Sequence, residues 1–213
     1  MSSIARTVLL CVVFISFVVA MFVYSTTRTP QLSDEELRAQ GVFLLPRPRD
    51  IAPFALTAPD GTVFDNASLQ GKWSFIFFGF THCPDICPTS MAVLGQVDRT
   101  LEQSQAADVE QPFHGVLISV DPERDTPAKL GAYAEAFSPR FSAATGSREA
   151  LVELTQQVNV AFAKIPDGEG GYTVDHTGNI VVINPRGHYH AFIKLPHKAE
   201  TIRLAYQTLA ARF

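Results

Sequence analysis

The sequence predicts an α/β domain, with helices on both faces of a mixed sheet, behind one apolar N-terminal helix. Two almost uncharged apolar runs, residues 72–80 and 114–120, are typical of strands that are buried on both faces. Apolar residues at helical spacing separate and follow these runs, and a hairpin and a helix close the chain. Strands that alternate with helices in this way form a layered α/β sheet.

Charge and composition exclude several classes of protein. The 213 residues carry 17 Lys plus Arg against 21 Asp plus Glu, and this net charge of −4 argues against nucleic acid as a partner, because binding it requires a basic face. Hydrophobic residues at 46% and charged residues at 18% exclude a largely disordered chain. Three cysteines are too few for a fold that is held together by disulfides.

The N-terminal segment predicts a membrane anchor at residues 1–25. Residues 8–24 contain no charge, Gly or Pro, and a helix of this length spans about 25 Å, the short end of a membrane span. A cleaved signal peptide is the alternative. The anchor is favoured because the apolar run is longer than a usual signal core and no small-x-small cleavage site follows it. The charges that flank the run do not determine its orientation.

Residues 26–49 are predicted to link this anchor to a domain at residues 50–213. The segment is polar and contains three prolines. Within it, Ser33 precedes three acidic residues, which is typical of the start of a helix. We therefore expect a short helix followed by an extended tether.

Each further element follows from its own pattern. The Asp60–Gly61 step between two short apolar stretches, residues 54–57 and 62–64, indicates a hairpin. Apolar residues at helical spacing over 91–101 predict a helix between the two buried strands. The remaining expected elements are helices at 127–137, 151–158 and 199–211, and a hairpin of strands 179–184 and 189–193.

Two cysteines lie where the first buried strand is followed by a helix. Cys83 and Cys87 are separated by three residues, and Pro88 suits a first helical turn, so Cys87 is expected at or next to the helix N-cap. The helix dipole and the free N–H groups there should lower the pKa of Cys87. The spacing allows a disulfide or a shared metal ion and does not decide between them. The motif favours a thioredoxin-like fold among the α/β folds that the element order permits.

A third candidate ligand comes from a distant turn. In thioredoxin-like proteins the turn before the penultimate strand lies against the cysteine turn and commonly contains a cis-proline, whereas this chain has Asp175, His176 and Thr177 there. His176 would add an imidazole to the two thiols. Two soft sulfur ligands and one nitrogen suit copper, Cu(I) above all, whereas a structural zinc site usually has a fourth protein ligand.

Three separated motifs resemble the SCO/SenC family: residues 78–88 (FGFTHCPDICP), 119–126 (SVDPERDT) and 174–177 (VDHT). Members of this family are membrane-tethered, thioredoxin-like copper proteins that assist assembly of cytochrome c oxidase. The resemblance covers residues 51–213. It implies copper, as Cu(I) or Cu(II), bound by Cys83, Cys87 and His176.

The resemblance also implies a function, partners and a location. The implied function is a metallochaperone, a carrier in preference to an enzyme, that delivers copper to the oxidase subunit carrying the CuA centre. Thiol reductants and other copper donors are further implied partners. The implied location is a bacterial inner membrane, crossed once by the N-terminal helix, with the soluble domain in the periplasm, because no Arg- and Ser-rich presequence is visible. The alternative is a thiol–disulfide oxidoreductase that uses a redox-active disulfide between Cys83 and Cys87 to reduce oxidase-subunit cysteines.

Several polar residues near the motifs are candidates for supporting roles. Asp85 lies between the cysteines, and a turn or electrostatic role suits its hard carboxylate better than copper ligation. His82 adjoins the first cysteine and is expected near the metal but not as a ligand, because adjacent side chains on an extended segment diverge. The resemblance adds Asp121 as a residue that supports the site or contacts a partner. His188 and His190 share one strand face, which we expect to be solvated.

Overall fold

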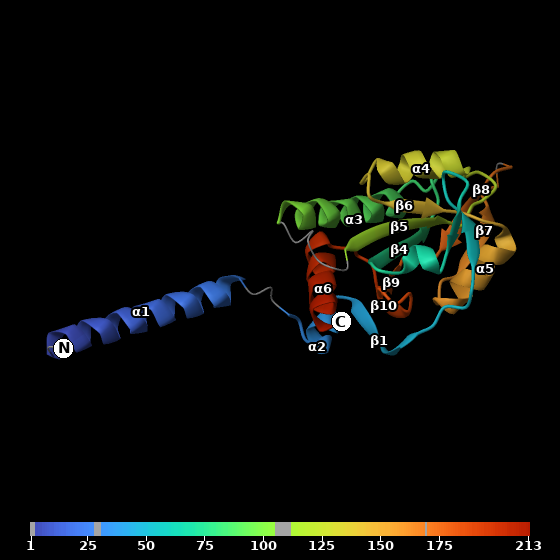
Figure 1. The fold of residues 1–213 in the computed structure, drawn as a ribbon. Coiled ribbons are helices and arrows are strands. Elements are labelled where there is room, and N and C mark those ends of the chain that lie inside the picture. Colours follow the sequence, from blue (N-terminus) through green and yellow to red (C-terminus); the bar gives the residue numbers. More distant parts are fainter. Residues whose placement is uncertain (1–2, 28–30, 105–111, 169) are drawn as a thin grey trace. The chain divides into compact units, whose positions relative to one another are not determined.

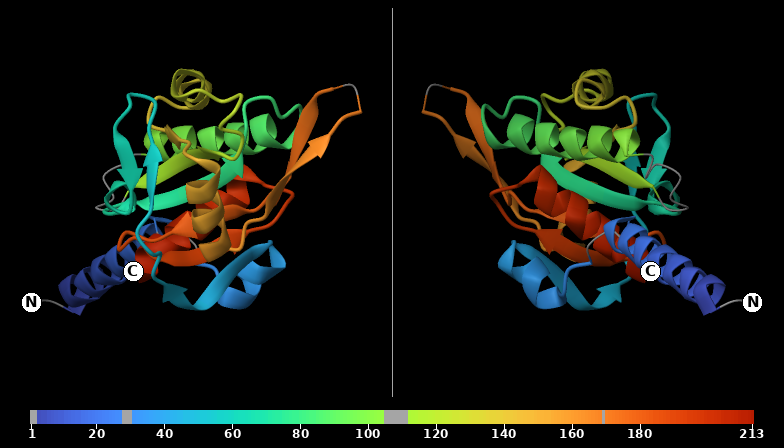
Figure 2. Two further views of the ribbon diagram at one scale, coloured as in Figure 1. Left: turned by 90° about the vertical axis from the view of Figure 1, so that its right-hand side faces the viewer. Right: turned by 90° about the vertical axis from the view of Figure 1, so that its left-hand side faces the viewer.

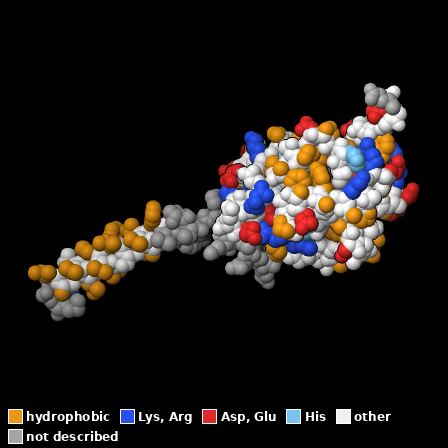
Figure 3. Space-filling model, turned by 90° about the horizontal axis from the view of Figure 1, so that it is seen from above, with side chains coloured by type: hydrophobic (Ala, Val, Ile, Leu, Met, Phe, Trp, Pro, Cys, Tyr) orange, Lys and Arg blue, Asp and Glu red, His pale blue; other side chains and the backbone are white. Residues whose placement is uncertain are grey.

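The computed structural model describes residues 3–27, 31–104, 112–168 and 170–213, which belong to two compact units. The first unit contains helix α1 (Ser3–Thr27). Its segment Ile4–Phe22 has a mean hydropathy of 2.5, and apolar side chains are exposed along it (Figure 3). This helix is long and apolar enough to cross a membrane, and a signal sequence near the N-terminus passes the same test.

The second unit, Leu32–Phe213, is built on a six-stranded mixed sheet (Figure 1). The strands of this sheet are β1 (Val42–Arg49), β4 (Trp73–Gly79), β5 (Phe113–Ser119), β6 (Ser142–Ala144), β9 (Ile180–Ile183) and β10 (Tyr189–Ile193). Their order is β1-β10-β9-β4-β5-β6; β4, β5 and β6 are parallel and the other neighbours are antiparallel. Two further pairs are β2 (Ala55–Thr57) with β3 (Val63–Asp65), and β7 (Phe162–Pro166) with β8 (Tyr172–His176).

Helices lie on both faces of the six-stranded sheet. They are α2 (Asp34–Ala39), α3 (Ile86–Gln103), α4 (Pro127–Glu135), α5 (Arg148–Gln157) and α6 (Ala199–Arg212), with a short 3-10 turn η1 (Ala67–Leu69). α3 packs against α6, and α4 packs on β5 and β6. Figure 2 shows α3 and α4 on one side of the central strands and α5 on the other. The side-chain oxygens of Ser33, Thr126 and Ser147 cap α2, α4 and α5.

The two central strands are buried along their whole length, which explains why their sequences are almost continuously apolar. Every residue of β4 and β5 is buried. Between them, the rings of Phe75 and Phe113 pack with centroids 4.7 Å apart, and Tyr206 of α6 packs on Phe113 at 5.6 Å. Close packing of this kind leaves side chains little freedom to move. The end of β4, where the cysteine turn begins, is therefore held by the core.

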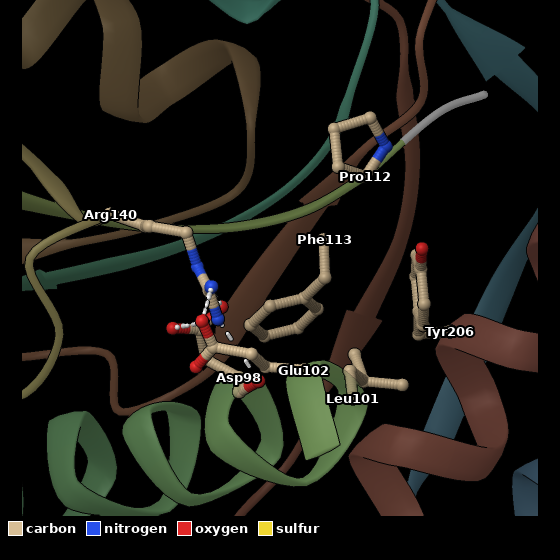
Figure 4. Close-up of a pocket in the computed structure, with 7 residues that line it drawn as sticks. All are labelled: Asp98, Leu101, Glu102, Pro112, Phe113, Arg140 and Tyr206. Carbon is tan, nitrogen blue, oxygen red and sulfur yellow. Dashed lines mark hydrogen bonds and ion pairs between the residues drawn. The ribbon is translucent and has the colours of Figure 1, made fainter. Parts of the chain in front are cut away.

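An ion pair between the exposed Arg140 and the buried carboxylate of Asp98 holds the C-terminal half of α3 (Figure 4). Asp98 is 4% exposed, and its carboxylate accepts a hydrogen bond from the Ser138 hydroxyl at 2.5 Å. The Arg140 guanidinium pairs with Asp98 at 3.0 Å and with Glu102 at 2.6 Å. These contacts tie α3 to the loop before β6. They orient the helix whose first turn contains one of the two motif cysteines.

The segment expected as a linker is partly folded into the sheet. We expect a tether over residues 26–49, but residues 42–49 form β1, which pairs antiparallel with β10, and Leu37 of α2 is fully buried. The prolines are tolerated because β1 is an edge strand and its regular pairing is interrupted between Leu44 and Arg49, where two of them lie. Residues 28–30 of the expected linker lie outside the described part of the chain.

The segment before β9 is a hairpin and not the expected turn. β7 and β8 pair along their full length, from Phe162 opposite His176 to Pro166 opposite Tyr172. The hairpin is separate from the six-stranded sheet, and Figure 2 shows it extending away from that sheet. Sequence patterns also miss β6, because three small residues carry no strand signal.

Candidate metal centre

The two predicted cysteines lie on the turn between β4 and α3. β4 ends at Gly79, and α3 begins at Ile86, after the N-cap residue Asp85. Cys87 is the second residue of the helix and is fully buried, whereas Cys83 in the turn before it is half-buried. Cys87 therefore lies in the first turn of the helix, one residue further along than the expected position at or next to the N-cap.

Gly79 leaves the space that the Cys87 side chain occupies. A Cβ at this glycine would lie 2.9 Å from the Cys87 Sγ and 2.9 Å from Cε1 of Phe77. Real side chains do not make contacts this short, so a larger residue here would displace the sulfur or the ring. The absence of a side chain at the strand end thus allows one thiol to pack directly on the sheet.

A buried carboxylate from the loop after β5 holds the cysteine turn. Asp125 is 1% exposed and accepts hydrogen bonds from the Thr81 N–H at 2.8 Å and from the Thr81 hydroxyl at 2.6 Å. It also accepts one from the Ser119 hydroxyl at 2.7 Å. Hydrogen bonds to an ionised carboxylate are stronger than neutral ones. Asp125 therefore fixes the start of the cysteine turn against the end of β5.

His176 reaches the cysteines from the last position of β8. Its Nε2 lies 3.4 Å from the Cys87 Sγ, and its ring stands edge-on to Phe77 and Phe80 with centroid distances of 5.7 and 5.8 Å. Its Nδ1 is 3.4 Å from the backbone oxygen of Thr177. A proton on Nδ1 is donated to that oxygen, which leaves the Nε2 lone pair facing the thiol.

Cys83, Cys87 and His176 form the one group of three potential metal ligands within the described residues. Their sulfur and nitrogen atoms lie within 4.8 Å of one another. One metal ion fits between atoms this close after small side-chain adjustments. Two sulfurs and an imidazole nitrogen suit a soft ion such as copper, whereas the four protein ligands typical of structural zinc are not assembled in this group.

The prediction that the helix N-terminus lowers the pKa of Cys87 is wrong. Burial raises the pKa of this thiol, and its hydrogen bond with Cys83 raises the pKa further. A backbone hydrogen bond at Phe80 acts in the opposite direction and is outweighed. Burial also lowers the pKa of His176, so its imidazole is neutral near pH 7 and offers a lone pair.

The other predicted residues lie outside this group. His82 is exposed, and its Nδ1 lies 3.1 Å from the Thr81 hydroxyl. Asp85 is exposed and occupies the N-cap of α3 without a side-chain hydrogen bond to the helix. Asp121 is 2% exposed and pairs with Arg124 at 2.5 Å in the loop after β5. None of the three is a member of the ligand group found among the described residues.

His188, just before β10, and His190 on β10 do not join the metal centre. His188 faces the carboxylate of Asp50 at 3.2 Å, and the ring of His190 stands edge-on to Trp73 at 5.1 Å. In the part of the chain that the structure describes, neither histidine belongs to a group of three potential ligands.

Sequence reasoning missed the aromatic side chains around the cysteines. Burial raises the pKa of Tyr133 on α4, and its electrostatic interaction with the two cysteines raises the pKa further. The Tyr133 hydroxyl is buried and has no hydrogen-bond partner among the described residues. Phe77 and Phe80 flank the imidazole. Helical or strand spacing identifies these residues as apolar, but it does not say which of them face a distant turn.

The sequence profile of the SCO1/SenC family matches residues 45–211. The chain belongs to this family. A Stutzerimonas stutzeri protein named for copper binding is 35% identical over 162 residues, which cover 76% of this chain and 78% of that protein. The mitochondrial SCO2 homolog of Bos taurus is 37% identical over 150 residues, which cover 70% of this chain and 55% of that protein, so the chain spans about half the length of this relative.

Solved structures of SCO proteins share the fold. Arabidopsis thaliana ScoI, determined with copper bound, has a TM-score of 0.70 and 30% identity, over 76% of this chain and 98% of that one. Apo Sco1 of Thermus thermophilus has a TM-score of 0.65 and 36% identity, over 79% of this chain and 94% of that one. The predicted thioredoxin-like α/β fold and the resemblance to the SCO/SenC family are confirmed.

Proposed function

We propose that this chain is a copper metallochaperone that holds copper between Cys83, Cys87 and His176. The observation that carries the proposal is the meeting of two thiols and one imidazole within 4.8 Å in a member of the SCO1/SenC family. The copper bound in Arabidopsis ScoI, a relative with 30% identity, supports copper as the cargo. A soft ligand set of this kind supports the same choice.

The three ligands differ in whether they must lose a proton to bind metal. A thiol binds copper as a thiolate, so each cysteine that ligates it releases a proton to solvent. The raised pKa of Cys87 keeps its thiol protonated in the absence of metal, and the positive charge of the metal offsets the cost of ionising it. The neutral His176 needs to lose no proton. Copper uptake therefore releases acid.

Thiol–disulfide exchange is the alternative activity of the same two cysteines, and it would begin at Cys83, the more accessible thiol. The two chemistries remain connected, because oxidation of Cys83 and Cys87 transfers two electrons and two protons to an oxidant and leaves a disulfide that no longer binds copper. In this proposal the disulfide is the form that does not hold copper, and thiol reductants restore the carrier.

The proposed destination of the copper is the CuA centre of a cytochrome c oxidase subunit. A docked subunit replaces the ligands of this chain, one by one, with its own thiolates and imidazoles. Cys83 is the accessible starting point for such an exchange, because it is half-buried whereas Cys87 is fully buried. Transfer is tested by mixing the loaded full chain with a copper-free CuA subunit. The CuA absorption should develop, and its absence would remove this part of the proposal.

The N-terminal helix is proposed to anchor the chain in a bacterial inner membrane with the folded unit in the periplasm. The apolar segment Ile4–Phe22 supports this. Alkaline extraction should leave the full-length chain in the membrane fraction, and a reporter enzyme that is active only in the periplasm should be active when fused after Phe213. A shortened, extractable chain would instead indicate a cleaved signal peptide.

The ligand set is tested by copper titration of the reduced full chain in detergent, against a competing chelator. The parent should bind one copper, and His176→Ala should bind it at least ~100-fold more weakly, because the site loses its nitrogen ligand. His188→Ala is the matched control and should bind like the parent, since that histidine contacts Asp50. If His176→Ala holds copper as tightly as the parent does, the proposed ligand set is wrong.

A further inference from the structure

The hairpin that carries His176 needs an attachment of its own. β7 and β8 share no strand pairing with the six-stranded sheet among the described residues. β8 begins at Tyr172 and ends at His176, so the two side chains stand on the same face of the strand, about 13 Å apart. Whatever holds Tyr172 therefore acts on the far end of a short, stiff element whose other end presents the imidazole.

Tyr172 is held by contacts of three kinds. The Cζ of Arg124 and the Nζ of Lys164 each lie over its ring, 3.9 Å from the centroid. Its hydroxyl donates a hydrogen bond to the Asp121 carboxylate at 2.8 Å. Its backbone oxygen accepts one from Nη1 of Arg124 at 2.9 Å. Cations over an aromatic face are attracted by the ring quadrupole, most strongly when water is excluded.

Arg124 connects this tyrosine to the metal centre. Its Nε pairs with Asp121 at 2.5 Å, and that carboxylate side chain is only 1% exposed. The Arg124 guanidinium also lies 5.6 Å from the ring of Phe80, which in turn stands edge-on to His176 at 5.8 Å. A chain of contacts thus runs from the loop after β5, through Arg124, to both ends of β8.

The contacts that hold Tyr172 differ in strength. Asp121 and Arg124 are buried or largely buried, whereas Lys164 pairs at 2.5 Å with Glu123, whose side chain is 64% exposed. Exposed ion pairs contribute little, while a shielded cation–aromatic contact and a hydrogen bond to a buried carboxylate contribute more. Asp121, Arg124 and Tyr172 are therefore the stronger part of the attachment, and Lys164 adds to it from the rim.

We propose that Tyr172 is a positioning residue for His176, and that the Tyr172 clasp, formed by Asp121, Arg124, Lys164 and Tyr172, sets how long copper is retained. The proposal rests on the proposed function, because it requires His176 to be a copper ligand. With the clasp closed, the imidazole stays against the cysteines. When it opens, the hairpin pivots on its connection to β9, the nitrogen ligand leaves, and two thiolates alone hold the metal.

The test is the rate of copper release from the reduced, Cu(I)-loaded full chain in detergent to an excess of a colorimetric chelator. Tyr172→Leu removes the ring and the hydroxyl and should release copper about tenfold faster, the lower end of the effect of residues that orient metal ligands. Tyr172→Phe keeps the ring and should release it about threefold faster. Thr173→Ala is the matched control. It alters an exposed residue of the same strand and should keep the parent rate.

Two further measurements distinguish a positioning role of Tyr172 from a purely structural one. The reduction potential of the Cys83–Cys87 disulfide, in metal-free protein, should be the same in Tyr172→Leu and in the parent, because the sheet and α3 hold both cysteines. In a His176→Ala background, Tyr172→Leu should no longer accelerate release, since the ligand that it positions is gone. Acceleration of equal size in both backgrounds would overturn the proposal.

The remaining outcomes separate this inference from the proposed function. Fast release by His176→Ala combined with the parent rate in Tyr172→Leu and Tyr172→Phe would overturn the clasp alone. Parent-like release by His176→Ala would overturn the ligand set and the clasp with it. If Tyr172→Leu fails to fold, as judged by its thermal unfolding, the decision passes to Tyr172→Phe, whose unchanged release would count against the proposal.

Discussion

The cysteine turn and the β7–β8 hairpin bring ligands to the same point, but the turn continues directly from a central strand, whereas the hairpin lies outside the six-stranded sheet and is held by side chains, among them the buried Val174. Cys87 follows a strand buried on both faces and packs against Gly79. His176 ends a strand whose described pairing is with β7 alone, and side-chain contacts hold it in place. Cys87 therefore depends on the packing of the sheet, whereas His176 depends on the side-chain contacts of its hairpin, both the buried Val174 and the polar and aromatic contacts of Tyr172. Copper binding should therefore respond differently to changes in the cysteine turn and to changes in the β7–β8 hairpin.

The largest expected effect is on copper affinity, which should fall more when the core ligand Cys87 is lost than when the hairpin ligand His176 is lost. Cys87→Ser should weaken copper binding at least ~1000-fold, because a hydroxyl is a poor ligand for a soft ion, against at least ~100-fold for His176→Ala. Competition with a chelator measures both. A greater loss in His176→Ala than in Cys87→Ser would reverse the comparison.

The pH dependence of copper affinity should arise from Cys87 and not from His176. The raised pKa of Cys87 means that its thiol is protonated near neutral pH, so binding releases this proton and affinity should rise about tenfold per pH unit on its account. The pKa of His176 is lowered, so this ring is already neutral and adds no slope above its pKa. Titrations at pH 7 and 8 should give the same slope for the parent and for His176→Ala. A flatter slope in the variant would contradict this assignment.

The packing of Cys87 on β4 predicts a loss of copper affinity that can be distinguished from a loss of stability. Gly79→Ala should lower the free energy of unfolding by about 1–3 kcal/mol, because the new Cβ crowds the Cys87 Sγ and Phe77, and it should also weaken copper binding. Gly115→Ala, on the neighbouring strand β5, is the matched control, since its Cβ would lie 2.6 Å from the ring of Phe141. That variant should lose similar stability and keep its copper affinity. Equal copper affinities in the two variants would contradict the argument.

The last prediction concerns acid destabilisation of the sheet through His114 of β5, which does not involve copper. Burial lowers the pKa of this histidine from 6.5 to about 3. Below pH 6.5 the unfolded chain takes up a proton that folded His114 does not, so stability should fall by about 1.4 kcal/mol per pH unit until the pH approaches 3.

Urea unfolding of the metal-free full chain, followed by fluorescence of the single tryptophan, Trp73 on the adjacent strand, measures this acid effect. His114→Gln should remove that part of the slope. The same slope in the parent and the variant would assign the acid sensitivity to other groups. Because His114 lies in the core sheet, the result also shows whether acid weakens the half of the site that holds the cysteines.

The features that could be predicted from sequence are those whose signal is local. The uncharged runs identify the central strands, helical spacing identifies the helices, and the motif around Cys83 and Cys87 places both cysteines at a strand-to-helix turn. The edge strand β1 was missed because its pairing with β10 joins segments about 150 positions apart. The roles of Asp125 and Tyr172 were missed for the same reason, since their partners come from other loops.

By itself, the sequence determined the α/β class, the apolar N-terminal helix, the family and the identity of the three candidate ligands. The tertiary structure alone decided that the Cys87 thiol is buried with a raised pKa, and that His176 stands at the end of a separately attached hairpin. The reason is physical. Periodicity and motifs record which residues neighbour one another along the chain, whereas burial, pKa and ligand retention depend on groups that meet only when distant segments pack.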